Sequence, residues 1–243
     1  MTGNRSAILT YHSLDNFGSV ISISPALFRR HMELLAQSGI PVVPLDEALG
    51  RSGAVALTFD DGYANFAEHA VPVLEHFDFP ATVFVVADYA GRTSDWPSLP
   101  YAKAPPLPLL GWGELAALPP AISVGAHSRT HPDLTRLPAG RCEEELRGSR
   151  ERLQQRLGRP VRWFAYPYGT SSPAVRTMAQ RHFELAVGSS LRFLHPGADR
   201  MDLPRIETYY LRGAFPLEKL FTAGGRVYIA FRRLLRDLRH AAA

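Results

Sequence analysis

Short apolar runs rich in β-branched residues alternate along the chain with segments of helical spacing, and this rhythm limits the possible folds most. Eight runs are short enough to be single strands: AILTY (7–11), IPVV (40–43), AVALTF (54–59), ATVFVVA (81–87), AISVG (121–125), VRWFAY (161–166), ELAVG (184–188) and LPRIET (203–208). Between them, segments such as 28–39 and 143–158 show helical spacing and end at a glycine. The alternation predicts an α/β fold, a (β/α) barrel that is distorted or incomplete, with roughly seven to eight parallel strands.

Size and composition favour one main domain. With 243 residues, 46% of them hydrophobic and 21% charged, the chain is long enough to bury one sizeable core. We expect the barrel to span residues 1–212 and a basic amphipathic tail to span residues 213–243. The apolar run at 7–11 is too short for a signal-peptide core or a membrane span, so we expect a cytoplasmic protein.

Polar clusters follow four of the predicted strands at the point where each strand ends. They are His12, Asp60-Asp61-Gly62, the segment from His127 to His131, and the segment from Tyr166 to Gly169. The strands of a parallel barrel open their carboxyl ends on one face, so these clusters should converge. The sequence therefore predicts a functional site at that face.

The two histidines and the paired carboxylates suit a metal site. His127 and His131 are four residues apart and can point the same way, and one carboxylate would complete three ligands with a position left open. An ion held there would lower the pKa of a bound water and polarise a carbonyl group. Two adjacent carboxylates at one strand end repel each other unless a positive group lies between them or they have different roles. Metal ligation by one and proton transfer by the other would separate those roles. Taken singly, the histidine pair also fits a helix surface, and Asp-Asp-Gly fits an ordinary turn.

Three ordered motifs resemble those of a known family. TFDDG (58–62), HSRTH with the following Pro-Asp-Leu (127–134) and FAYPYG (164–169) are similar to the first three motifs of the polysaccharide deacetylase family, carbohydrate esterase family 4. The resemblance extends from about Ala7 to Tyr209. It implies a metal-dependent hydrolase that removes the N-acetyl group of an amino sugar such as N-acetylglucosamine.

The resemblance also assigns roles to single residues. It implies that Asp61, His127 and His131 ligate the metal and that Asp60 is the general base. The backbone N–H of Tyr168 would stabilise the oxyanion of the tetrahedral intermediate. Zinc is the default ion, while Co²⁺, Fe²⁺ and Ni²⁺ also accept mixed nitrogen and oxygen ligands.

Two departures from the family pattern concern the general acid and the tether of the base. The usual Leu-x-His motif is absent, and His195 in RFLHPG does not match it. His12 in ILTYHSL instead resembles the acid of the circularly permuted branch, which includes deacetylases of biofilm poly-N-acetylglucosamine; a buried histidine satisfied by the backbone is the alternative. Ala165 stands where an arginine usually tethers the base, so we expect Arg205 to replace it. Arg162 is the other candidate, and a surface salt bridge is the alternative role for Arg205.

Other functions stay open at this point. The same site would suit a formamido sugar or a cyclic imide. A second class of function is a non-catalytic glycan- or lipid-binding protein on the same fold. The intact acidic pair and histidine pair argue against that class, because a decayed site would be expected to lose at least one of them.

The net charge of +4 resides in the C-terminal tail, where five arginines from Arg226 onward oppose the single Asp237. The rest of the chain is close to neutral, without the basic surface of a nucleic-acid binder. Residues 226–239 predict a helix with arginines on one face, as in helices that lie on anionic membranes. The opposite face is apolar: Val227, Tyr228, Phe231, Leu234, Leu235 and Leu238.

The amphipathic tail bears on substrate and location. It favours a lipid-linked amino sugar, as in exopolysaccharide biosynthesis, and a peripheral place on the inner face of the membrane. Docking against the barrel or a second copy is the alternative.

Three further expectations concern surface features. The proline-rich stretch 88–120 is expected to form a long loop over one mouth of the barrel. Its aromatic residues Trp96, Tyr101 and Trp112 would either stack on a sugar ring or anchor the loop. Cys142 and His31 lie in charged helical segments and are expected to be exposed.

Overall fold

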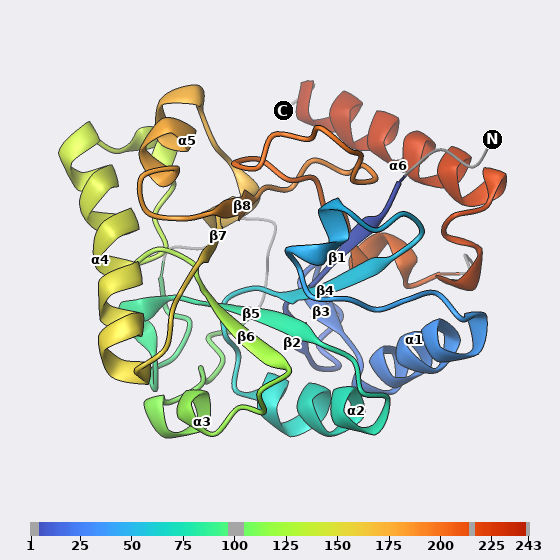
Figure 1. Ribbon diagram of the computed structural model, residues 1–243, viewed down its shortest axis with the longest axis horizontal. Coiled ribbons are helices and arrows are strands. Elements are labelled where there is room, and N and C mark those ends of the chain that lie inside the picture. The colour runs from blue at the N-terminus through green and yellow to red at the C-terminus, as the bar shows by residue number, and fades with distance from the viewer. Residues whose placement is uncertain (1–4, 97–104, 214–216, 242–243) are drawn as a thin grey trace.

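The computed structural model describes residues 5–96, 105–213 and 217–241. Within them, a seven-stranded parallel sheet curls into a half-barrel with helices around its outside (Figure 1). The strand order is β8-β7-β6-β5-β4-β1-β9. The bounds are β1 Ala7–Tyr11, β4 Val55–Phe59, β5 Ala81–Val85, β6 Ile122–Ala126, β7 Trp163–Ala165, β8 Leu185–Val187 and β9 Ile206–Glu207. The expected incomplete (β/α) barrel is therefore confirmed.

The edges of the barrel are joined by irregular backbone. The N–H of Gly188 donates to the carbonyl of Leu203 at 2.9 Å, and the N–H of Leu203 donates to the carbonyl of Ala186 at 2.9 Å. The predicted strand at 40–43 is reduced to one bridge between Val42 and Val55. Pro41 and Pro44 flank it, and proline has no N–H to extend a ladder.

Capping residues mark several of the helix ends. Ser24 caps α1, Pro25–Ser38, which stops at Gly39 with φ 67°. The same left-handed stop occurs after α4, Ala139–Leu157, at Gly158 with φ 64°. The other helices are α2 Val71–His76, α3 Trp112–Ala116, α5 Pro173–Ala179 and α6 Ala223–Ala241. Shorter elements are β2 Ser13–Leu14, β3 Ser22–Ile23, η1 Glu47–Leu49, η2 Phe66–Ala70, η3 Ala87–Tyr89, η4 Leu134–Arg136, η5 Pro167–Gly169, η6 Thr208–Leu211 and η7 Leu217–Lys219.

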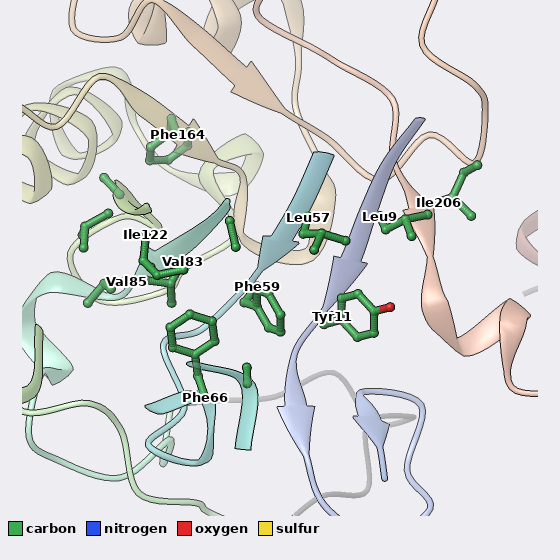
Figure 2. Close-up of a cluster of buried hydrophobic side chains, with 14 of the residues drawn as sticks. Leu9, Tyr11, Leu57, Phe59, Phe66, Val83, Val85, Ile122, Phe164 and Ile206 are labelled. Carbon is green, nitrogen blue, oxygen red and sulfur yellow. The ribbon is translucent and has the colours of Figure 1, made fainter. Parts of the chain in front are cut away.

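Alternate residues of each strand face opposite layers. Figure 2 shows Leu9 and Tyr11 of β1 beside Leu57 and Phe59 of β4, in the layer between sheet and helices. Tyr11 stacks on Phe59 at 5.2 Å, and each such buried side chain contributes about 1.5–3 kcal/mol. The intervening residues of the strands, whose side chains point the opposite way, form a second cluster inside the half-barrel. It includes Ile8, Ala56, Phe84 and Ala165. Because strand side chains alternate, His12 and Asp60 continue this inner row just past the strand ends.

Two expected surface residues are buried instead. Cys142 is fully buried on the core side of α4. His31 on α1 is buried as well, and its Nδ1 lies 3.0 Å from the hydroxyl of Tyr11. The expectation of exposure was wrong for both, because charged neighbours on a helix do not reveal which face packs on the sheet.

The C-terminal helix α6 runs along one side of the barrel (Figure 1). Ile229 is buried in the main core, and the hydroxyl of Tyr228 donates to the carbonyl of Tyr210 at 2.5 Å. A stripe of large apolar side chains on the helix is 54–69% exposed: Val227, Phe231, Leu234 and Leu238. Among the described residues, no helix combines the length and the apolarity needed to cross a membrane.

Candidate active site and metal centre

The loops at the carboxyl ends of the strands bring the expected side chains together. Asp60 and Asp61 follow β4, and His127 follows β6. Asp61 has φ 70° and Gly62 has φ 72°, which produces a sharp turn after the strand. The turn directs the two neighbouring carboxylates to different partners.

Asp61, His127 and His131 form a buried three-residue cluster whose potential ligand atoms all lie within 4.8 Å of one another. Asp61 Oδ1 lies 3.4 Å from His127 Nε2 and 3.3 Å from His131 Nε2. Burial alone would raise the pKa of Asp61, but hydrogen bonds with the two histidines hold that pKa well below its usual value. The carboxylate therefore stays ionised in the buried cluster.

The tautomer of His127 suits ligation. Its Nδ1 lies 2.7 Å from the carbonyl of Ala165 and donates to it, so Nε2 is the ring nitrogen that faces Asp61 and would ligate an ion. One carboxylate oxygen and two imidazole nitrogens are a donor set that divalent transition metals accept, with room for a further ligand. The residues present therefore fit a divalent metal ion.

A buried carboxylate holds the loop that carries the two histidines. Glu145 on α4 is 3% exposed and accepts hydrogen bonds from the backbone N–H groups of Arg129 at 2.8 Å and Thr130 at 2.9 Å. Its other oxygen accepts from the Thr130 hydroxyl at 2.7 Å. Sequence reasoning missed Glu145, because it sits in a run of three glutamates on a charged helix.

Asp60 pairs with an arginine, whereas Asp61 faces the two histidines. Arg205, which is 1% exposed, donates from both terminal nitrogens to the two carboxylate oxygens at 2.7 and 2.6 Å. Burial would raise the pKa of Asp60, but the charge and hydrogen bonds of Arg205 lower it below the usual value. Arg162, the other sequence candidate, instead pairs with Glu184 on the surface at 2.7 and 2.6 Å. Of the two candidate arginines, Arg205 is thus the one that pairs with Asp60.

His12 lies at the opening of the same site. Its Nε2 is 3.8 Å from Asp60 Oδ2, its Nδ1 is 3.9 Å from Glu207 Oε2, and its side chain is 18% exposed. Burial raises the pKa of Glu207. The sequence analysis did not identify Glu207, although this residue is only two positions after Arg205 in the predicted strand 203–208. His195 is exposed and lines a different hollow.

The loop after β7 carries Tyr168 in a left-handed conformation with φ 58°. Its hydroxyl donates to the carbonyl of His131 at 3.3 Å, which places this loop against the cluster of Asp61, His127 and His131. Gly169 follows with φ 67°, and a side chain there would meet Ser189 at 2.2 Å. The close approach explains why glycine follows Tyr168.

Two tryptophans of the proline-rich stretch pack against side chains of the protein. Trp96 is 5% exposed, with its ring 4.7 Å from that of His131. Trp112 lies in the short helix α3 under the guanidinium of Arg156 at 4.9 Å. Both rings are thus engaged with protein, as the anchoring alternative predicts, while Tyr101 lies outside the described residues.

A hollow of about 430 Å³ opens beside the segments that follow His12 and Asp61. Phe17, at its wall, is 62% exposed. Asn65, four residues after Asp61, also lines it and donates to the hydroxyl of Ser13 at 2.8 Å. Since Ser13 follows His12, the hollow adjoins the loops of both Asp61 and His12.

Comparison with known proteins identifies a matching family and related sequences. The sequence model of a family described as polysaccharide deacetylase matches residues 50–183, a range that holds the three motifs but not His12 or Arg205. The chitooligosaccharide deacetylase of Rhizobium leguminosarum bv. trifolii is 28% identical over 185 residues, covering 65% of this chain and 78% of that protein. The first two curated relatives, both from Bacillus subtilis, are matched over 18% and 56% of their own lengths.

Solved structures share the fold. IcaB from Ammonifex degensii gives a TM-score of 0.73 at 22% identity, covering 93% of this chain and 97% of that chain. A deacetylase from Streptococcus pyogenes, PplD, solved in complex with acetate, gives 0.72 at 21% identity, covering 84% and 92%. At these sequence identities, the structural similarity establishes a shared fold and nothing about activity.

Proposed function

Because this chain belongs to the polysaccharide deacetylase family, we propose that it is a metal-dependent hydrolase that removes the N-acetyl group of an amino sugar, releasing acetate and a free amine. The observation that carries the proposal is the division of labour between two adjacent carboxylates. Asp61 faces two histidines, while Asp60 is clamped by Arg205 beside them.

Asp61, His127 and His131 would hold the metal, with zinc as the first choice and Co²⁺, Fe²⁺ or Ni²⁺ as alternatives. When bound, the ion supplies Lewis acidity that polarises the acetamide carbonyl and acidifies a water molecule. Trp96 against the His131 ring and Tyr168 against the His131 carbonyl shield this position from bulk water. Such shielding strengthens the electrostatic interactions within the site.

The chain's own residues would move the protons. Asp60, held ionised by Arg205, takes a proton from the water whose oxygen bonds to the carbonyl carbon. The backbone N–H of Tyr168 donates to the resulting oxyanion. His12 then gives its proton to the amide nitrogen as the C–N bond breaks, which yields acetate and the amine.

A saccharide substrate is supported by the hollow beside the catalytic loops. Phe17 offers an exposed aromatic face of the kind on which sugar rings stack, and Asn65 adds an amide at the wall. Phe17→Ala should therefore raise KM for an N-acetylated oligosaccharide about tenfold while changing kcat by less than about twofold. An equal KM for wild type and variant would exclude this hollow as the sugar site.

The exposed apolar stripe of α6 suggests where the substrate is located. We propose that residues 213–243 are an accessory segment on the barrel of residues 1–212. Through residues 226–239, this segment would rest on an anionic membrane, where the amino sugar is lipid-linked. A polymeric N-acetylated sugar is the alternative substrate.

Acetate release from N-acetylated sugars tests the proposal. The metal-replete full chain is assayed on lipid-linked, nucleotide-linked and oligomeric substrates, with and without a chelator. Acetate should be released by the wild type, lost with the chelator, restored by added zinc, and absent from Asp60→Asn. Formate release from a formamido sugar in place of acetate would instead establish the deformylase alternative.

A non-catalytic role predicts a different pattern. In that case, no amide substrate is turned over by the wild type, and Asp60→Asn binds saccharides as the wild type does. That combination would refute the enzyme proposal even if the chain still bound metal.

A further inference from the structure

The apolar stripe of α6 is the largest unpartnered apolar feature that the structure describes. Val227, Phe231, Leu234 and Leu238 follow one another at intervals of four, three and four residues, which places them on one helical face. Of the described residues, these and Phe17 are the large hydrophobic side chains that are exposed. A stripe this long points to a surface that is covered when the protein works.

A basic hollow lies beside the stripe, between α6 and the segment that follows β8. It measures about 270 Å³, and its basic lining comes from three distant parts of the chain: Arg5, Arg192, His195, Arg226 and Arg233. Its apolar lining includes the buried Ile229 and Phe193, and no carboxylate lines it. Four arginines in the lining of one hollow of this size, with no acidic residue among them, make it strongly basic.

The arginines of the hollow are little neutralised by the protein. Arg5 and Arg192 make no ion pair within the described parts of the chain. Arg226 donates to the carbonyl of Phe221 at 2.7 Å, a neutral acceptor, and Arg233 lies 3.6 Å from the half-exposed Asp237. Like charges held together without counter-charges repel one another, so an anion in the hollow would relieve that repulsion.

We propose that this basic hollow binds the phosphate group of an anionic phospholipid while the neighbouring apolar stripe enters the bilayer interface. The inference rests on the proposed membrane association and adds a defined headgroup site to it. Guanidinium groups bind phosphate oxygens in pairs, and an interfacial helix keeps its arginines at headgroup depth while its apolar face lies in the acyl boundary. Arg226 and Arg233 lie on α6 itself, so the hollow and the stripe flank one another around the same helix.

Vesicle binding of the full chain tests the site. Purified protein is sedimented with phosphatidylcholine vesicles and with vesicles that also contain phosphatidylglycerol. The test variant Arg5→Gln/Arg192→Gln removes two charges from the hollow. The matched control Arg30→Gln/Arg181→Gln removes two from side chains that are 55% and 64% exposed on other elements.

The wild type should prefer the anionic vesicles. Arg5→Gln/Arg192→Gln should lower that affinity at least about tenfold, whereas the control should lower it less than about threefold. Phe231→Ser/Leu234→Ser should weaken binding to both kinds of vesicle. All variants should keep the wild-type melting temperature and the wild-type rate on a soluble N-acetylated sugar, because none touches the catalytic loops.

The outcomes separate the possible failures. If the hollow variant binds anionic vesicles as tightly as the control does, the phosphate site is wrong, while membrane association through the stripe stands. If the wild type binds neither kind of vesicle, both membrane inferences fail. If the wild type binds vesicles but releases acetate from no substrate, the proposed activity fails and the headgroup site stands.

Discussion

Asp60 and Asp61 are neighbours in sequence with opposite surroundings, and the difference comes from their contacts. Arg205 pairs with both oxygens of Asp60, whereas two histidines face one oxygen of Asp61. The pKa of each carboxyl is lowered, so both stay ionised despite burial. Adjacent carboxylates can share one strand end because each has a positive or hydrogen-bonding partner of its own.

The bidentate geometry makes Arg205 sensitive to a change that keeps its charge. Arg205→Lys should lower kcat about 100-fold, because an ammonium group cannot hold both oxygens of Asp60 in one orientation. Metal content should stay at the wild-type level, since Arg205 does not touch the metal cluster. The measurements are steady-state kinetics and bound metal per chain. Arg162→Lys, in the surface pair with Glu184, is the control and should leave kcat unchanged.

Burial of His31 couples stability to pH. Burial lowers the pKa of His31 to about 4, below its ordinary value of 6.5. The unfolded chain therefore binds this proton more readily, so the contribution to stability is complete above pH 6.5 and is lost as the pH falls toward 4. The loss amounts to roughly 3 kcal/mol.

Urea unfolding at a series of pH values checks this linkage. The wild type should lose more stability between pH 6.5 and 4 than His31→Gln, which has no imidazole to protonate. His69→Gln, at a position 32% exposed, should keep the wild-type slope. Equal slopes for His31→Gln and the wild type would show that His31 is not the coupled group.

At the scale of elements, the helix α4 controls the shape of the histidine loop. Ser128 and His131 both have φ 61°, a conformation that non-glycine residues rarely adopt. The loop keeps it because Glu145 binds its backbone N–H groups and Ser128 Oγ accepts from the N–H of His131 at 3.0 Å. Helix packing thus positions His127 and His131, the two histidines of the proposed metal site.

Glu145→Gln should weaken metal affinity about 10- to 100-fold, because its amide has one acceptor oxygen where the carboxylate has two. Competition with a fluorescent chelator measures the affinity. Glu151→Gln, on the exposed side of the same helix, should bind metal as the wild type does. Unchanged affinity in Glu145→Gln would mean that the loop keeps its shape without this carboxylate.

The elements differ in how far the sequence could predict them. Strands β1, β4, β5 and β6 are apolar runs whose positions could be predicted from the sequence. The meeting of His12, the acidic pair and the histidines at one face could be predicted as well, because each follows the end of a predicted strand. Glu145, Glu207 and the burial of Cys142 were missed, since each depends on which distant segment packs against it. The basic hollow was missed for the same reason, because Arg5 and Arg192 are far from α6 in sequence.

At the scale of the whole molecule, the proposed metal site joins loops that follow two strands, β4 and β6, with β5 between them in the sheet. Its three donors are separated by up to 70 residues of sequence, so they come together only when the barrel is folded. A metal that binds the folded chain and not the unfolded chain adds its binding free energy to the stability of the fold.

Zinc should therefore raise the melting temperature in a concentration-dependent way. At a free concentration 100 times the Kd, the gain is about 2.7 kcal/mol, which for a chain of this size corresponds to roughly 5–10 °C. Differential scanning fluorimetry against free zinc, buffered by a chelator, measures it. His127→Ala should show no rise, because removing one of three ligands abolishes tight binding, whereas His69→Ala should follow the wild type. A full rise in His127→Ala would place the metal elsewhere in the chain.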